Sequence, residues 1–265
     1  MTRPDLTLFP LIHECPELLV VHKPAGLVCH PTKAGPLSSL VSRVRLHLGT
    51  EAEPQMVHRL DRETSGVLVF GKTPDAALEL RRLWGLGLIT KEYRALVQGH
   101  VVADSGTIDA PLGPDDASPV AIKDCVRPDG AQARTRYRVE RRFVRGGSPY
   151  TRLRVWLDTG RKHQIRIHCA HLGHPLVGDK IYGGDENLYL AFVERRLSPD
   201  DRARLQLACH ALHAERLWLP WHGAEVEFSS PPEPWFLGFE RGEVVPWFED
   251  DPGPGGSVTS QSRRA

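Results

Sequence analysis

The apolar residues of this chain come in short runs, and this pattern constrains the fold more than any other feature. Val67–Phe70 and Leu18–Val21 each hold four consecutive apolar residues, and no run approaches a membrane-spanning length. A helix that crosses a membrane needs about 18 apolar residues in succession. Short runs of β-branched and aromatic residues are instead typical of buried strands. The sequence therefore excludes a membrane span and predicts a folded chain with buried strands.

Segments of other periodicity lie between these runs. Apolar residues three or four positions apart predict a helix over 37–48 that ends at Gly49. Thr73-Pro74-Asp75 combines a cap residue, a proline in the first turn and an acid at the positive end of a helix, so it predicts a helix over 73–84. Similar reasoning predicts helices over 164–172 and from Ser198, strands over 92–98, 134–140, 151–157, 212–219 and 225–228, and an exposed loop over 111–132.

No internal repeat or break in composition divides the 265 residues. Because strands and helices are mixed without a strict βαβ order, we expect an α+β fold: a single domain with a mixed, largely antiparallel central sheet flanked by helices and loops. We place this domain at residues 1–250 and expect 251–265, which are rich in Pro, Gly and Ser, to be a disordered tail. The N-terminus lacks the pattern of a secretory signal, so we expect a cytoplasmic protein.

Positive charge is concentrated in one stretch, although the formal net charge is only +1. Residues 134–166 hold 11 Lys and Arg against two acidic residues. The alternation of the 151–157 strand places Arg152 and Arg154 on the same face of a sheet. Because guanidinium groups bind phosphate in a bidentate way, this face is a candidate nucleic-acid surface. The alternative is an ordinary solvated basic face.

The most polar segment, 57–66, directly precedes the buried strand at 67–70. Polar groups beside a buried strand cost stability unless each finds a partner, so such loops are often functional sites. Asp61 lies between Arg59 and Arg62, and neighbouring positive charges keep a carboxylate ionised. An ionised, oriented carboxylate is suited to act as a nucleophile or an acceptor. The alternative is a salt-bridged turn that anchors the strand.

A second polar segment follows a predicted strand at Gly160. Arg161 and Lys162 open the helix predicted over 164–172, and a helix N-terminus with basic side chains attracts phosphate. His168, His171 and His174 offer a weaker alternative, a metal site. Because Gly173 and Pro175 are expected to break the helix on either side of His174, the spacing is poor for metal binding, and we expect no metal. The five cysteines form no CxxC pair and predict neither a zinc site nor a disulfide framework.

Several of these segments together resemble a known family. His58-Arg59-Leu60-Asp61 followed by Thr64-Ser65-Gly66 resembles the signature of the RluA family of RNA pseudouridine synthases. The resemblance extends over about residues 15–230, and its further motifs follow in order at 23–27 with 30–31, 91–93, 106–113, 160–168, 174–183 and 212–217. Two departures are His22, where the family usually has Asp or Asn, and the acidic pair Asp115 and Asp116. No segment resembles an S4 RNA-binding module, and because few residues precede the first predicted strand, we expect none.

The resemblance implies an isomerase that converts uridine in ribosomal or transfer RNA to pseudouridine without a cofactor. Nothing in the sequence demands more than a monomer, so a monomer is expected. The resemblance also implies that Asp61 is the essential carboxylate, that Arg166 is its salt-bridge partner, and that the Tyr93 ring stacks on a flipped-out uracil. Arg59 would fill the gap left in the RNA or contact neighbouring nucleotides. The other expected binding residues are Arg62, Arg161, Lys162, Ile165 and Leu176, of which the last two either wall the pocket or pack in the core.

Two further possibilities stay open at this point. One is a non-catalytic RNA-binding protein on the same scaffold, and the other is a metal-dependent hydrolase. The sequence does not choose among addition of Asp61 to C6 of the base, attack on C1′ and a glycal route, and it does not identify the RNA. His58, His163 and Gln164 are expected to be supporting, hydrogen-bonding residues.

Overall fold

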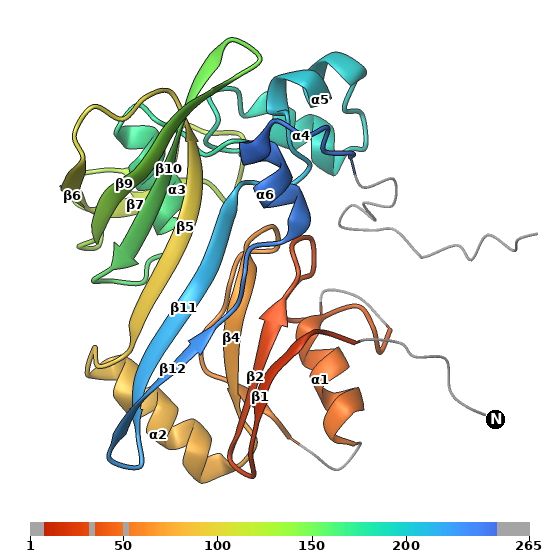
Figure 1. The fold of residues 1–265 in the computed structure, drawn as a ribbon, viewed down its shortest axis with the longest axis vertical. Coiled ribbons are helices and arrows are strands. Elements are labelled where there is room, and N and C mark those ends of the chain that lie inside the picture. Colours follow the sequence, from red (N-terminus) through yellow and green to blue (C-terminus); the bar gives the residue numbers. More distant parts are fainter. Residues whose placement is uncertain (1–7, 32–34, 50–52, 248–265) are drawn as a thin grey trace, which may run out of the picture.

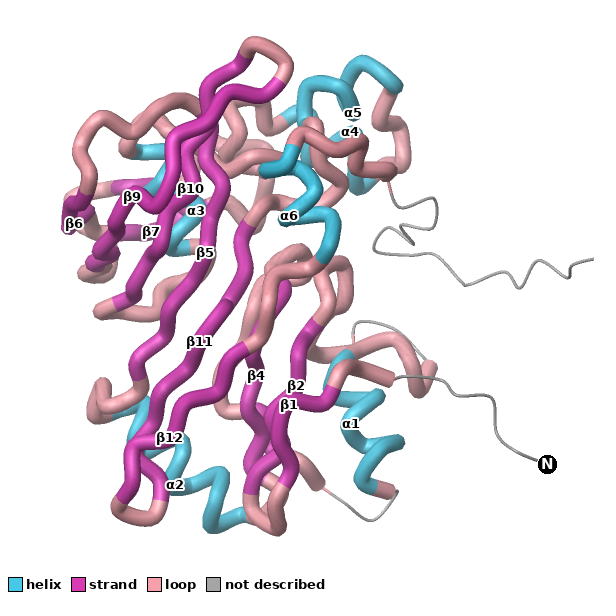
Figure 2. Tube along the Cα trace, in the orientation of Figure 1, coloured by secondary structure: helices cyan, strands magenta, loops and turns pink. Residues whose placement is uncertain are grey.

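One long, twisted sheet runs through the molecule (Figures 1 and 2) in a computed structural model, which describes residues 8–31, 35–49 and 53–247. The tail predicted over 251–265 lies outside the described residues. The strands are β1 (Leu11–Glu14), β2 (Leu18–Lys23), β3 (Gln55–Met56), β4 (Ser65–Gly71), β5 (Thr90–Gln98), β6 (Ser105–Asp109), β7 (Leu112–Pro114), β8 (Asp124–Val126), β9 (Arg134–Arg145), β10 (Ser148–Leu157), β11 (Leu212–Trp221) and β12 (Ala224–Ser229).

The strand order of the main sheet is β1-β2-β4-β11-β5-β10-β9-β6, with β3 paired to β4 and β12 paired to β11. Neighbouring strands are antiparallel except β4 and β11, which run parallel over a short stretch. β7 and β8 form a separate two-stranded sheet. The predicted α+β fold with a mixed, largely antiparallel sheet is therefore confirmed.

The helices are α1 (Leu40–Leu48), α2 (Pro74–Gly85), α3 (Gln164–His171), α4 (Asn187–Val193), α5 (Pro199–Leu205) and α6 (Pro234–Arg241). Two of them, α1 and α2, cover opposite faces of β4, which explains why its apolar sequence is uninterrupted. Val67 and Val69 pack with residues of α2, whereas Leu68 and Phe70 pack with residues of α1 on the opposite face. No helix in the described part of the chain is long and apolar enough to span a membrane.

Local signals at helix ends were reliable. The Thr73 side chain caps α2 by accepting the N–H of Ala76, and Pro74 occupies the first turn. Ser198 and Asp201 form the reciprocal capping box expected at the start of α5. These caps depend only on neighbouring residues, so the sequence predicts them directly.

Other elements were not predicted. The stretch 111–132 is not a continuous loop, because it contains β7 and β8, each three residues long. The elements β1, β3, β6, α4 and α6 were also missed. The missed strands and α4 are short. The helix α6 is buried by distant residues, because its Phe236 and Phe239 pack on Phe143 and Tyr150 of the β9–β10 hairpin. Such elements depend on tertiary packing more than on local propensity.

Gly66 fixes the position of the polar segment against the sheet. Its φ of +121° lies in a region that favours glycine, and a Cβ there would lie 2.1 Å from the carbonyl oxygen of Ala214 in β11. The parallel pairing of β4 with β11 includes this close approach. The segment that ends at Gly66 is therefore tied directly to the centre of the sheet.

Candidate active site

An open cavity of about 660 Å³ lies where the loop before β4, the first residues of β5 and the start of α3 meet. Asp61 belongs to the loop, Tyr93 to β5 and Arg166 to α3, and all three line the cavity. This volume falls within the range of small-molecule sites. The fold thus brings the three predicted catalytic residues, which are far apart in the sequence, to one cavity.

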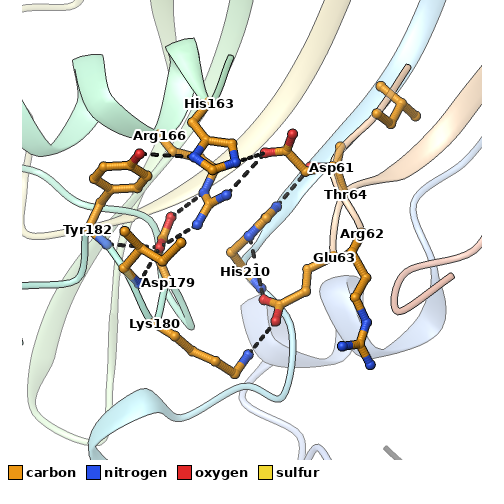
Figure 3. A network of polar contacts seen from close by, with 12 residues as sticks. Asp61, Arg62, Glu63, Thr64, His163, Arg166, Asp179, Lys180, Tyr182 and His210 are labelled. Atoms are coloured by element: carbon orange, nitrogen blue, oxygen red, sulfur yellow. Dashed lines mark hydrogen bonds and ion pairs between the residues drawn. The ribbon is translucent and has the colours of Figure 1, made fainter. Parts of the chain in front are cut away.

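Asp61 is held through one of its two carboxylate oxygens. Nη1 of Arg166 donates to Oδ2 of Asp61 at 3.1 Å (Figure 3), whereas Oδ1 accepts no hydrogen bond from the described residues. The side chain is 23 % exposed, so the cavity reaches it. Burial alone would raise the pKa of Asp61, but the positive charge of Arg166 outweighs burial and lowers it. Asp61 is therefore ionised at neutral pH and keeps one oxygen available.

Arg166 has a second and closer partner in Asp179. Its Nε donates to Oδ2 of Asp179 at 2.7 Å and its Nη2 donates to Oδ1 at 2.9 Å. The backbone N–H groups of Ile181 and Tyr182 also donate to Oδ1 of Asp179, which is fully buried. The predicted pair between Asp61 and Arg166 is present, but the bidentate contact that fixes the guanidinium comes from Asp179.

A buried lysine anchors the loop that carries Asp61. Nζ of Lys23 donates to the carbonyl oxygens of Pro24, Leu27 and Arg62 at 2.8–2.9 Å. Lys23 has no exposed surface, and its burial lowers the pKa to about 8. Because one ammonium group joins the turn after β2 to the loop after Asp61, it holds the two segments at a fixed separation.

The residues after Asp61 are held by a second set of contacts (Figure 3). Oε1 of Glu63 accepts from Nζ of Lys180 at 2.7 Å, and Oε2 accepts from the backbone N–H of His210 at 3.1 Å. The hydroxyl of Thr64 lies 2.7 Å from Nε2 of the same histidine. The chain on the C-terminal side of Asp61 is therefore fixed to the segment that leads into β11.

Gln164 fixes the start of the helix that carries Arg166. Its Oε1 accepts from the N–H of Arg161 and its Nε2 donates to the carbonyl oxygen of Arg134 and to the hydroxyl of Thr135. These bonds join the first turn of α3 to β9. They agree with the supporting role expected for Gln164.

Tyr93 forms a wall of the cavity and is otherwise buried, with 7 % of its surface exposed. Burial raises the pKa of its hydroxyl, and the negative charge of Asp61 adds to this effect. The phenol is therefore neutral at physiological pH. No group among the described residues is hydrogen-bonded to its hydroxyl, so the ring and the hydroxyl are available to a ligand.

Three of the predicted binding residues line the cavity: Arg59, Arg161 and Ile165. Arg59 is exposed and makes no hydrogen bond or ion pair with the described residues. Nε of Arg161 donates to the carbonyl oxygen of Gln132, and its side chain is also exposed. Ile165 is 3 % exposed. It packs in the core and also lines the cavity, so the two positions expected as alternatives are both occupied.

The other three expected binding residues do not line the cavity, although core packing was one of the two positions expected for Leu176. Nε of Arg62 donates to the carbonyl oxygen of Gly26, and its side chain points away from Asp61 (Figure 3). Leu176 is completely buried in the core, where it forms a bridge with β5. Nζ of Lys162 pairs with Asp124 at 2.8 Å.

The basic face of the sheet is also different from the prediction. Arg152 and Arg154 do share a face, but Arg154 contacts Glu92 and Glu140, and Arg152 contacts Glu140 and Glu240. These glutamates come from other strands and from α6, and their charges oppose those of the arginines. This surface is therefore an ion-pair network and not a free phosphate-binding face.

The acidic pair that departs from the family pattern is neutralised in a similar way. Asp115 lies 3.1 Å from Nζ of Lys123, and Asp116 lies 2.8 Å from Nη1 of Arg127. All four residues belong to the segment that contains β7 and β8. The acidic residues are therefore part of internal pairing within this segment.

His58 and His168 have structural partners. Nε2 of His58 accepts the N–H of Val69, and its ring stacks on Trp84. Burial lowers the pKa of His58 to about 3, and the positive charge of Lys91 adds to this effect, so it is neutral, as expected for a supporting residue.

Both ring nitrogens of His168 are engaged, by Thr135 and by the carbonyl oxygen of Ala110. Within residues 8–31, 35–49 and 53–247, no group of three or more His, Cys, Asp or Glu could hold a metal ion.

Three important residues had no predicted role: Asp179, Tyr182 and His210. Asp179 and Tyr182 lie in the motif at 174–183, where two charged residues, Asp179 and Lys180, interrupt an otherwise apolar and glycine-rich stretch. Buried charges need partners, so this interruption was the available signal. The partner of Asp179, which is Arg166, could not be identified without the fold.

Comparisons with known proteins agree with this geometry. The family model described as RNA pseudouridylate synthase matches residues 17–171. An uncharacterized RNA pseudouridine synthase of Chloroflexus aurantiacus is 39 % identical over 217 residues, which are 79 % of this chain and 61 % of the relative. Ribosomal large subunit pseudouridine synthase D of Salmonella typhimurium is 36 % identical over 227 residues, 83 % of this chain and 66 % of the relative. The chain thus spans about three-fifths to two-thirds of the length of these relatives.

A solved structure, human RNA pseudouridylate synthase domain containing 1, has a similar fold. Its TM-score is 0.68 at 25 % sequence identity, and the match covers 88 % of this chain and 86 % of the human chain. The match therefore extends over most of both chains.

Proposed function

Because the chain belongs to the RNA pseudouridylate synthase family, as its motifs predicted, we propose that it isomerises uridine in RNA to pseudouridine with Asp61 as the reacting carboxylate. In this reaction the bond between N1 of uracil and C1′ of ribose breaks, and a bond between C5 and C1′ forms. C5 loses a proton and N1 gains one. Atoms and electrons therefore balance without a redox partner.

The observation that supports this proposal best is the state of Asp61. Its carboxylate is ionised, is held through Oδ2 by Arg166, and has Oδ1 free in a cavity. All three routes to pseudouridine require an ionised carboxylate at a fixed position beside the nucleotide. Because the guanidinium is itself fixed by Asp179, the oxygen that it contacts, Oδ2 of Asp61, is held before a substrate binds.

Tyr93 fits the second requirement of the reaction, which is to hold a base outside its helix. The aromatic ring lines the same cavity as Asp61, and stacking of a base on such a ring contributes about 1–3 kcal/mol. A uridine inside a helix is not accessible to Asp61, so the nucleotide must flip out. Tyr93 offers the surface on which the flipped uracil would stack.

Arg59 and Arg161 support RNA as the substrate class. Both are exposed at the cavity, where they can contact the phosphates on either side of the flipped uridine. One relative is named for the large ribosomal subunit. We therefore propose ribosomal RNA of the large subunit as the first substrate to test, and transfer RNA as the second.

The test uses unmodified transcripts of both RNAs with the purified full chain. Pseudouridine is located by mass spectrometry after a pseudouridine-specific chemical label. We expect conversion at one or a few uridines by the wild type, and no conversion by Asp61→Asn, which should still bind the same RNA. Lys72→Ala is the matched control, because Lys72 pairs with Glu14 away from the cavity. RNA binding without conversion by the wild type would instead support a non-catalytic RNA-binding protein.

A further inference from the structure

His163 has an unusual backbone on the wall of the cavity. Its φ of +56° is left-handed, although it is not a glycine, and it directly precedes α3. Residues held in this conformation have a local energetic cost and cluster at functional sites. The side chain lines the cavity between Tyr182 and Asp61 (Figure 3). Its position raises the question of which ring nitrogen faces Asp61 and whether that nitrogen has a proton.

The hydrogen bonds of Tyr182 answer this question. Its hydroxyl oxygen accepts the backbone N–H of Asp124 at 3.2 Å and lies 2.9 Å from Nδ1 of His163. No other acceptor among the described residues is bonded to this hydroxyl, so its proton is donated to Nδ1. Burial raises the pKa of Tyr182, which therefore keeps that proton at neutral pH.

The proton of His163 must then be on the other nitrogen. Burial lowers the pKa of His163 to about 4, and the charge of Arg166 adds to this effect, so the ring is neutral and has a single N–H. With Nδ1 accepting from Tyr182, that N–H is at Nε2. Nε2 faces Oδ2 of Asp61 at 4.0 Å, so it is a donor aimed at the carboxylate.

We propose that His163 is a positioning residue that donates its Nε2–H to Oδ2 of Asp61 when RNA is bound, so that Oδ1 alone is left to react with the nucleotide. This inference rests on the proposed function. The distance is about 1 Å longer than a hydrogen bond, and contacts of this kind often tighten only when the substrate is bound. Arg166 already donates to the same oxygen at 3.1 Å.

A neutral second donor has a specific advantage here. Two donors that approach one oxygen from different directions fix the rotation of the carboxylate, which one donor does not. A second cation would do the same but would also stabilise the negative charge and make the carboxylate less reactive. The charge of Arg166 is already opposed by Asp179, and His163 adds none. The arrangement thus orients Asp61 with little loss of nucleophilicity.

The test compares two substitutions of His163 in single-turnover reactions at saturating protein. In His163→Gln the side-chain amide reaches the position of Nε2, whereas in His163→Asn it reaches only the position of Nδ1. Asn also tolerates the left-handed backbone well, so a loss in this variant is not a backbone effect. We expect His163→Asn to slow conversion about 10–100-fold, as loss of an orienting partner does elsewhere, with unchanged RNA affinity. His163→Gln should recover most of the rate.

A double-mutant cycle with Tyr182→Phe isolates the route of the effect. Tyr182→Phe should slow conversion when His163 is present, because the hydroxyl that fixes the ring is lost. It should have no further effect in the His163→Asn background. Tyr150→Phe is the matched control, since it removes a buried tyrosine hydrogen bond, to Gln206, far from the cavity. We expect its rate to equal that of the wild type.

Two results would overturn the inference: a rate for His163→Asn equal to that of His163→Gln, or an equal cost of Tyr182→Phe in both backgrounds. If His163→Asn does not fold, Tyr182→Phe alone still tests the inference, because a rate equal to that of the wild type would contradict it. Conversion by the wild type and its loss in Asp61→Asn test the proposed function separately. The inference can therefore fail while the proposed function stands.

Discussion

Replacing Asp179 by asparagine should cost about 3–5 kcal/mol of unfolding free energy, the range found when one partner of a buried ion pair is removed. Asp179 is completely buried and accepts two N–H groups of Arg166 at 2.7 and 2.9 Å. Asparagine has nearly the same shape and can still accept the N–H groups of Ile181 and Tyr182. The loss would therefore arise from the guanidinium, which stays buried without its bidentate acceptor.

The pH dependence of this loss identifies its origin. The pKa of Asp179 in the folded protein is well below its usual value: burial opposes this shift, and the charge of Arg166 outweighs burial. A carboxylate with a lowered pKa stabilises the fold above its unfolded pKa of about 3.9, and this contribution is lost as the pH falls toward the folded value. The difference in unfolding free energy between the wild type and Asp179→Asn should thus be constant from pH 8 to about 5. It should decrease below about pH 4.

Urea unfolding of the wild type and the variant at a series of pH values measures both quantities. Glu79→Gln is the control, because Glu79 makes a similar short contact with Arg82 but on an exposed surface, where ion pairs contribute little. Its unfolding should match that of the wild type. A loss below about 1 kcal/mol in Asp179→Asn would refute the reasoning that Arg166 depends on this carboxylate.

Three further predictions concern the anchors and the RNA contacts. Lys23→Met should cost about 2–4 kcal/mol in urea unfolding, because three carbonyl acceptors lose their shared donor, and unchanged stability would contradict this. Gly66→Ala should cost at least about 3 kcal/mol or prevent folding, since its Cβ would overlap the Ala214 carbonyl oxygen; soluble, stable protein would show that β4 can move. Arg59→Ala should weaken RNA binding and reduce the slope of log affinity against log salt concentration by about 0.7–0.9, whereas Lys72→Ala should leave the slope unchanged. Equal slopes for wild type and Arg59→Ala would remove Arg59 from the RNA contacts.

Local chemistry was the part of this protein that its sequence made predictable. The start of α2 at Thr73 and the capping box at Ser198 depend on residues within one turn, and the sequence indicates both. Both caps are determined by residues only a few positions apart, so no knowledge of the fold was needed. Asp61 differs, because the charge that keeps it ionised comes chiefly from Arg166 and not from its sequence neighbours Arg59 and Arg62.

Partners from distant segments were the part that could not be predicted. The pattern of β10 correctly placed Arg152 and Arg154 on one face, but the glutamates that neutralise them lie on β5, β9 and α6. Likewise Arg62 was expected to be a binding residue, yet its side chain points away from Asp61. Only the fold shows which charges face each other across elements.

The most direct test of the central claim is the release of tritium from RNA labelled at C5 of uridine, measured in a single turnover at saturating protein. If an ionised Asp61 carries out the isomerisation, the wild type should release one tritium for each uridine converted. Asp61→Asn should release none while it binds the RNA with the same affinity. Release by Asp61→Asn within tenfold of the wild-type rate would contradict the account.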